Sequence, residues 1–493
     1  MDFKKILPFP AKTPAKAALP ARAVSAVLAV LMGAALLLSG CGNKEETVLR
    51  PEDYDAFLSA GLTSEMNTPD YWIAKAKKLD KVLLTRQKIQ QLNQQILTQE
   101  GLGCYDILNA PAELKKAELS ALLLRNALPD TPRYIEETAV DESYYTNLMS
   151  NVNLAGLEET NLVSYGVVAD NAPMRAFPTN DPSYARPNDL ERDLFQLTTL
   201  KTWEQVRVLH QSLDGLWYYV QSYSDMGWVP VESVALVSTK EEWRRYGEGA
   251  VLVVTGNRIQ LGANPYTEAF SQKELRMGAR LPLVAAADAP KTIDGMAAQG
   301  SYIVMLPIRG ANGMLTTRLA LIPRSADVNF GYLEYTQANL LRQAFKLVGD
   351  RYSQGGLFDG RDDGMLIQDV YAAFGIFLPR EGSRQAQVTG NPVSLAQPAA
   401  LSELEEEDKR KILSQLKAGA ILYMDGHAML YLGQSEEVPY ILHAVSQFGV
   451  SQSADSPPDS YDVNTVAVTD LGIYHNNGQT YLTNLSACVS IGG

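Results

Sequence analysis

The sequence predicts an α+β protein that is built from several domains. The chain of 493 residues is long enough for three or four domains. Helical periodicity dominates residues 51–130, and short strand-like runs bounded by turns begin near Tyr165. A third pattern, two helical runs followed by three apolar strands, occupies residues 341–447. An apolar content of 46% with 20% charged residues is ordinary for a folded protein and excludes a largely disordered chain.

The first 40 residues predict a targeting segment that is not part of the fold. Five basic residues precede or flank the start of an apolar run, residues 23–38, that is short for a permanent membrane span. The run ends in Leu38-Ser39-Gly40-Cys41, which resembles a bacterial lipobox. This resemblance implies that Cys41 carries lipid and begins the mature chain. We therefore expect a cell-envelope protein that is lipid-anchored on the periplasmic side of a membrane. The sequence leaves open whether this is the outer membrane. An ordinary secretory signal is the alternative.

The net charge bears on the possible partners, and the cysteine count bears on a possible disulfide. The formal charge of −13 argues against nucleic acid, because phosphate binding needs a basic surface. After Cys41 only Cys104 and Cys488 remain. In an oxidising compartment these two could pair, and two buried thiols are the alternative.

The N-terminal third predicts amphipathic helices. Residues 78–97 place apolar side chains at an interval close to 3.6 residues, and residues 111–128 follow the same pattern with Pro111 at the first helical position. This block carries few chemically reactive groups, so we expect a packing or clamp element.

The middle of the chain predicts small antiparallel β-units. Residues 205–209 and 216–221 flank Ser212-Leu213-Asp214-Gly215, whose Asp-Gly pair is a hairpin turn signal. A second region, residues 250–323, predicts strands at 251–255, 302–307 and 317–322.

The C-terminal region carries the candidate chemistry. A helix is predicted at residues 341–350 and a second at 365–374, with Tyr352-Ser353-Gln354-Gly355-Gly356 and Gly360-Arg361-Asp362-Asp363-Gly364 between them. Strands follow at 420–424, 428–433 and 440–445. His427 opens the second of these strands, and His443 lies in the third.

This order resembles the catalytic domain of the NlpC/p60 cysteine peptidases, which cut the stem peptides of bacterial cell wall. The resemblance implies a helical N-terminal stabilising domain (residues 41–158), two bacterial SH3-like β-barrels (159–240 and 241–330) and a papain-like NlpC/p60 domain (331–493). In that family a thiolate at the first turn of a helix is the nucleophile, since the helix N-terminus lowers the thiol pKa.

The nucleophilic cysteine of the family belongs where this chain has Asp363. Tyrosine, both glycines and the leading aspartate of the family pattern are retained, whereas Gln354, Asp363, Gly364 and Met365 replace Trp, Cys, Ser and Gly. The resemblance makes His427 the base and His443 the residue that orients it. Because aspartate is a favoured helix N-cap, we expect Asp363 to cap the second helix. A polar core pair is the alternative for the two histidines.

The resemblance also implies contacts with the stem peptide. Tyr352, Arg380 and Glu381 occupy positions near the family site, although Glu381 replaces an aspartate there. Asp193, Glu191 and Tyr223 of the first barrel are placed to meet the peptide's amine, with surface charge and core aromatic as the alternatives. His210 and His475 are expected to be hairpin or turn residues, and the sequence indicates no partner for either. We expect no metal and no cofactor, because zinc spacing is absent and Arg361 and Val370 interrupt a calcium-type loop.

The favoured function is a lipid-anchored envelope protein, related to gamma-D-glutamyl-diaminopimelate endopeptidases, that binds the peptidoglycan stem peptide without cleaving it. One alternative is a pseudoenzyme scaffold that binds an envelope protein partner. The other is an active murein peptidase with a non-cysteine nucleophile.

Overall fold

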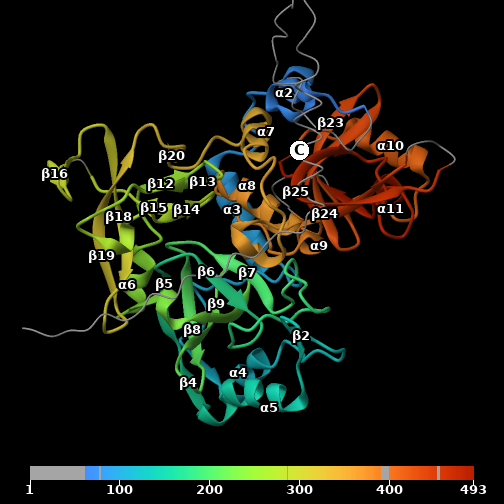
Figure 1. The fold of residues 1–493 in the computed structure, drawn as a ribbon. Helices are drawn as coiled ribbons and strands as arrows, with labels where there is room; N and C mark the ends of the chain where they lie inside the picture. The colour runs from blue at the N-terminus through green and yellow to red at the C-terminus, as the bar shows by residue number, and fades with distance from the viewer. Residues whose placement is uncertain (1–60, 77–78, 286, 390–398, 452–455, 493) are drawn as a thin grey trace, which may run out of the picture. The chain divides into compact units, whose positions relative to one another are not determined.

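The computed structural model describes residues 61–76, 79–285, 287–389, 399–451 and 456–492 (Figure 1). The predicted targeting segment and Cys41 lie outside these ranges. Within the described ranges no helix combines the length and the hydropathy needed to cross a membrane.

The N-terminal region is helical in part. Its helices are α2 (Pro69–Lys75), α3 (Arg86–Thr98), α4 (Lys116–Leu123) and α5 (Glu142–Asn151). Thr85 caps α3 by accepting the Lys88 N–H, so the helix predicted at 78–97 begins only at Arg86. The expectation of an all-helical block is wrong, because β1 (Glu113–Lys115) pairs with β4 (Thr160–Leu162) and β2 (Tyr134–Ile135) pairs with β3 (Thr138–Ala139). Pro111 therefore precedes a strand and does not begin a helix.

Two hydrophobic cores divide this N-terminal region between them. Trp72 and Leu92 pack in a core made mainly of C-terminal residues. Leu119 and Val152 pack in another core, with the strands of the middle region. The start of the described chain is thus tied to its end, and residues 107–157 belong with the β-units.

The first β-unit is a seven-stranded antiparallel sheet in the order β11-β5-β8-β9-β10-β6-β7. Its strands are β5 (Ser164–Val168), β6 (Ala172–Arg175), β7 (Gln196–Leu200), β8 (Gln205–Gln211), β9 (Trp217–Gln221), β10 (Met226–Pro230) and β11 (Val234–Val237). The hairpin predicted around Asp214-Gly215 is confirmed, with β8 and β9 paired from Gln211 opposite Tyr218. Gly215 has φ +74°, a conformation that a side chain disfavours, which explains the turn.

The second β-unit follows α6 (Lys240–Arg245) and is split into small sheets. Its strands are β12 (Val251–Val254), β13 (Arg258–Gln260), β14 (Glu274–Arg276), β15 (Arg280–Pro282), β16 (Thr292–Ile293), β17 (Met296–Ala297), β18 (Ser301–Arg309), β19 (Leu315–Pro323) and β20 (Val328–Phe330). The three strands predicted here correspond to β12, β18 and β19.

The C-terminal region sets helices against a six-stranded antiparallel sheet in the order β21-β26-β22-β23-β24-β25. Its helices are α7 (Gln337–Phe345), α8 (Asp363–Ala372), α9 (Gly382–Gln385), α10 (Glu406–Gln415) and α11 (Tyr481–Asn484). Its strands are β21 (Ala399–Ala400), β22 (Ile421–Met424), β23 (His427–Ser435), β24 (Val438–Val450), β25 (Asp459–Asp470) and β26 (Ala487–Val489).

Helix α8 is the buried centre of this region. Its residues 364–372 are all buried, and it packs against β23 and β24 (Figure 1). This contact brings the first turn of α8 next to the start of β23.

The two cysteines lie in different cores. Cys104 packs at the edge of the core that holds Trp72, whereas Cys488 is buried in β26 within a third core. Cys488 is buried, and Cys104 is partly buried.

Candidate functional site

Asp362 caps α8 and fixes its orientation. Asp362 Oδ1 accepts the Met365 N–H at 2.9 Å, and Oδ2 accepts the Gly355 N–H at 2.9 Å. Arg380 forms an ion pair with the same carboxylate at 2.5 Å, and both side chains are only 10% exposed. The expectation that Asp363 caps the helix is therefore wrong, because the preceding aspartate takes that position.

The loop before α8 is held rigidly by Arg361. This side chain is fully buried and donates from Nε to Asp369 Oδ2 at 2.8 Å, from Nη2 to Asn257 O at 3.0 Å, and to Asp350. Although burial opposes a charged carboxylate, the neighbouring cations, Lys201 first, lower the pKa of Asp369 to about 2. The buried charges are paired, as burial requires.

The two glycines of the loop allow the first β-unit to approach it. Gly355 and Gly356 have φ of +64° and +80°. A Cβ at Gly355 would lie 2.8 Å from Gln196 O, and one at Gly356 would lie 2.6 Å from Thr199 Oγ1. Both positive φ and close approach favour glycine here.

Asp363 is the first residue of α8, and its carboxylate points across to β23. Its Oδ2 accepts the Ala428 N–H at 2.6 Å and lies 3.8 Å from His427 Nδ1, beyond hydrogen-bonding distance. Burial, followed by the charge of Asp362, raises the pKa of Asp363 to about 7. Near neutral pH both the protonated and the charged form of this carboxyl group are therefore populated.

The two histidines form the pair that the sequence suggests. His427 Nε2 and His443 Nδ1 are 2.8 Å apart, and His443 Nε2 lies 3.1 Å from the Thr469 hydroxyl. Burial, and then His475, lowers the pKa of His427 to about 3, while burial lowers the pKa of His443 well below its usual value. Both rings are thus neutral at physiological pH, and His427 presents Nδ1 to Asp363.

A groove of about 450 Å³ opens in front of Asp363 and His427. Tyr352 lines it as expected, and burial raises the pKa of its phenol above the usual range. The side chains that line it also include Arg192, His475 and Tyr481, which the sequence did not single out as site residues.

His475, for which the sequence indicates no partner, contacts Tyr481 in the structure. Its ring lies 6.1 Å from that of Tyr481, which also contacts His427 at 5.8 Å between centroids. His475 and Tyr481 follow the last long strand, far from the motif, so their approach depends on tertiary structure. The pattern of the sequence contains no local signal for it.

The other residues expected to contact a peptide do not line this groove. Arg380 is used within the protein, with Nε donating to Thr198 Oγ1 at 2.9 Å and Nη2 to Leu197 O at 3.1 Å, besides its ion pair. Glu381 is exposed and pairs with Arg384 at 3.3 Å.

The first β-unit contributes a different residue from those predicted. Asp193 is buried in an ion pair with Arg175 at 2.7 Å, and the ring of Tyr223 packs at a tilt against Phe377 in another cavity. Glu191 pairs with Arg351 at 2.7 Å. Arg192, which lies between Glu191 and Asp193 in sequence, reaches the groove and donates to Ser446 Oγ at 3.1 Å.

Two histidines and a carboxylate are the reactive groups of the site. His210 lies elsewhere, in strand β8 of the β8–β9 hairpin, with Nε2 at 3.0 Å from Asn153 O, a partner that the sequence did not indicate. In the part of the chain that the structure describes, no group of three or more His, Cys, Asp or Glu side chains is placed to hold a metal ion.

Comparisons with known protein families match two regions of the chain. The model of the NlpC/P60 family matches residues 349–462, and the model of an SH3 domain of the SH3b1 type matches residues 182–230. No curated protein matches the chain.

Solved structures share the fold at low sequence identity. A structure described as a novel NlpC/P60 endopeptidase from Photobacterium damselae subsp. piscicida is 18% identical, with a TM-score of 0.64, and the match covers 85% of this chain and 96% of that one. An NlpC/P60 family protein from Bacillus cereus is 17% identical, with a TM-score of 0.45 over 67% of this chain and all of that one. The chain is therefore a mixed α+β, multidomain protein that contains an SH3 domain of the SH3b1 type and an NlpC/P60 domain.

Proposed function

We propose that this protein is a lipid-anchored component of the bacterial cell envelope that binds peptidoglycan stem peptide without cleaving it. The observation that carries the proposal is the carboxylate of Asp363 on the first turn of α8, 3.8 Å from His427 Nδ1. The NlpC/P60 domain supports a substrate related to peptidoglycan. The groove that remains open beside Asp363 supports retained binding.

Asp363 is a poor replacement for a thiolate. A carboxylate that attacks an amide must form a mixed anhydride and expel an amine, which is a harder exchange than thioester formation. His427 has no thiol proton to accept, and the Ala428 N–H already occupies Asp363 Oδ2. These features argue against the alternative of an active peptidase with an unorthodox nucleophile.

A scaffold that binds an envelope protein partner is the second candidate. It is favoured by the fact that Asp193, Tyr223, Arg380 and Glu381 do not line the groove. The paired histidines and Tyr352, which do meet at the groove or directly behind it, favour the peptide ligand.

The decisive experiment incubates purified sacculi with the full chain and with its Asp363→Cys variant. We expect the natural chain to sediment with sacculi and release no peptides. Cleavage by Asp363→Cys would show that the groove still holds a peptide productively. His427→Ala in the Asp363→Cys background is the matched control and should abolish any regained cleavage.

Three results would change this conclusion. Peptide release by the natural chain would overturn the loss of catalysis. Failure of both forms to sediment would overturn the wall ligand and favour the protein-partner scaffold. Cleavage by Asp363→Cys that survives His427→Ala would mean that the histidine pair is not the retained base.

The lipid anchor rests on the sequence around Cys41 alone. If Cys41 is acylated, Cys41→Ala should move the full chain from the membrane fraction to the soluble fraction and remove labelling by a palmitate analogue. Unchanged fractionation and labelling would rule the anchor out.

A further inference from the structure

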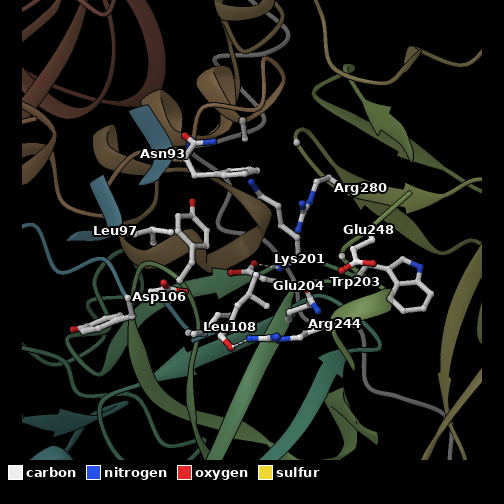
Figure 2. A pocket seen from close by; sticks show the side chains of 18 of the residues that line it. Asn93, Leu97, Asp106, Leu108, Lys201, Trp203, Glu204, Arg244, Glu248 and Arg280 are labelled. Carbon is white, nitrogen blue, oxygen red and sulfur yellow. Dashed lines mark hydrogen bonds between the residues drawn. The ribbon is translucent and has the colours of Figure 1, made fainter. Parts of the chain in front are cut away.

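A second hollow lies away from the groove. It encloses about 550 Å³, within the range of small-molecule sites, and is bounded by α3, residues 105–109, the turn between β7 and β8, β15 and the end of α8 (Figure 2). It shares no lining residue with the groove of Asp363 and His427. Five parts of the chain thus enclose one cavity, which is typical of ligand sites between domains.

Arg280 supplies a positive charge to this cavity. Its guanidinium lies over the Phe377 ring, 5.3 Å from the centroid, and Nη1 is 3.4 Å from the Tyr332 hydroxyl. Among the described residues no carboxylate lies within ion-pair distance of Arg280, although, against the opposing effect of burial, the Tyr332 hydroxyl and, from farther away, the charge of Glu204 on the same cavity raise its pKa. Because a half-buried cation is costly without a counter-ion, the cavity is prepared for an anionic group at this end.

Glu204 supplies a negative charge to the same cavity (Figure 2). Its Oε2 accepts the Lys201 N–H at 3.1 Å, and burial raises the pKa of its carboxyl group. The Lys201 ammonium pairs with Asp369 instead, so among the residues described Glu204 has no ion-pair partner. A cationic donor would satisfy the remaining oxygen.

The turn that presents Glu204 is strained. Trp203, directly before it, has φ +71°, which is rare for a bulky residue. The indole N–H donates to Met305 O at 2.8 Å and the ring is buried, which holds this conformation. Backbone strain that surrounding contacts maintain is common where a side chain must be presented to a ligand.

Aromatic rings form the wall near the two charges. The rings of Tyr223 and Phe377 lie 5.6 Å apart between centroids, and Leu97 adds an aliphatic surface. A ligand with one charge would leave either Arg280 or Glu204 unpaired, whereas a zwitterion satisfies both. We propose that this cavity binds a short peptide with free ends, its carboxylate on Arg280 and its amine on Glu204.

Calorimetry on the full chain with three peptides tests this assignment. The probes are trialanine, N-acetyl-trialanine, which lacks the amine, and trialanine amide, which lacks the carboxylate. We expect saturable binding of trialanine and about tenfold or greater weakening by either block, as for loss of a charge-assisted hydrogen bond.

Variants assign each end of the peptide. Glu204→Gln should weaken the binding of trialanine, and N-acetylation should then weaken binding no further, whereas amidation still should. In Arg280→Gln, amidation should weaken binding no further, whereas N-acetylation still should. Glu241→Gln is the charge-matched control outside the cavity and should bind as the natural chain does. Asp363→Asn, at the separate groove, should leave this binding unchanged.

Contrary results are readily recognised. Equal binding of all three peptides by the natural chain, or no saturable binding at millimolar trialanine, overturns the proposal even if a variant fails to fold. Loss of trialanine binding in Asp363→Asn alone would assign the peptide to the groove. The outcome with sacculi does not depend on this cavity, so the two proposals can fail separately.

Discussion

At the residue scale, the site differs from a working thiol–histidine pair in its protonation as well as in its atoms. A thiolate pair relies on a helix N-terminus to stabilise a negative charge. Here burial, and then the charge of Asp362 at the N-cap of α8, raise the pKa of Asp363 and push its carboxyl group towards the neutral form. The neighbouring His427 is neutral as well. The substitution thus leaves a polar but weakly charged contact between helix and sheet.

A prediction on pH follows from Asp363. Its pKa rises on folding from near 3.8 to about 7, so the native state binds the proton more tightly than the unfolded state. The stability associated with that proton is complete below about pH 4 and is lost as the pH rises through 7. Asp363→Asn removes this loss. The free energy of unfolding of the variant, minus that of the natural chain, should therefore be larger at pH 8 than at pH 4.5 by about 1 kcal/mol or more.

Urea unfolding of both chains at the two pH values measures this difference. Comparing the variant with the natural chain cancels the opposite pH dependence of the neutral histidines. Asparagine keeps an oxygen that can accept the Ala428 N–H, so the variant is a fair isostere. A difference that does not change with pH, or that shrinks towards pH 8, would contradict a raised pKa.

The central residues of the candidate site could be predicted from the sequence, and its walls could not. Asp363, His427 and His443 lie in local motifs whose order fixes their places. Arg192 and His475 reach the groove through contacts between remote segments, for which no spacing gives a signal. Arg380 was predicted as a peptide contact, yet a buried arginine next to Asp362 is first required as its counter-ion.

At the element scale, the start of α8 depends on one carboxylate with three partners. Asp362 joins the helix to the glycine loop and to Arg380. Two adjacent aspartates made the cap ambiguous in sequence, because either could precede the apolar run. The choice follows from Arg380 and the Gly355 N–H, which both meet the first aspartate.

Substitution of Asp362 should separate the cap from the charge. Asp362→Ala leaves Arg380 buried without a carboxylate and should lower the free energy of unfolding by about 3–5 kcal/mol. Asp362→Asn retains an oxygen for the Met365 N–H, so its loss in the free energy of unfolding should be about 1 kcal/mol smaller than that of Asp362→Ala. Urea denaturation at pH 7 measures both, and equal losses in the two variants would mean that the cap contributes nothing.

Predictions of elements failed where a strand partner replaced local helical preference. Residues 113–115 belong to an amphipathic pattern, yet they pair with β4 more than 40 residues away. The strands of the β8–β9 hairpin were easier to predict, since the turn at Asp214-Gly215 and the strands that it joins are close in sequence. The end of α8 was also clear, because Gly375, with φ +78°, stops the helix.

At the scale of the whole molecule, the first β-unit is joined to the C-terminal region through buried polar contacts. Gln196 Nε2 donates to Gly355 O at 3.0 Å, and Arg380 Nε donates to Thr198 Oγ1 at 2.9 Å. The exposed pair of Arg351 and Glu191 contributes little by comparison, because solvent screens it. The loop that positions the site is thus shared by two regions, and neither completes it alone.

This sharing predicts that the two regions unfold together. Four of the five tryptophans lie between residues 203 and 243, so in a Trp72→Phe chain the fluorescence reports the first β-unit and its neighbour α6. Urea curves followed by fluorescence and by far-ultraviolet circular dichroism should coincide. Adding Asp362→Ala, in the C-terminal region, should shift both midpoints equally, and Thr198→Val should begin to separate them. Two transitions in the Trp72→Phe chain itself would show that the buried contacts at Gly355 and Arg380 do not couple the regions.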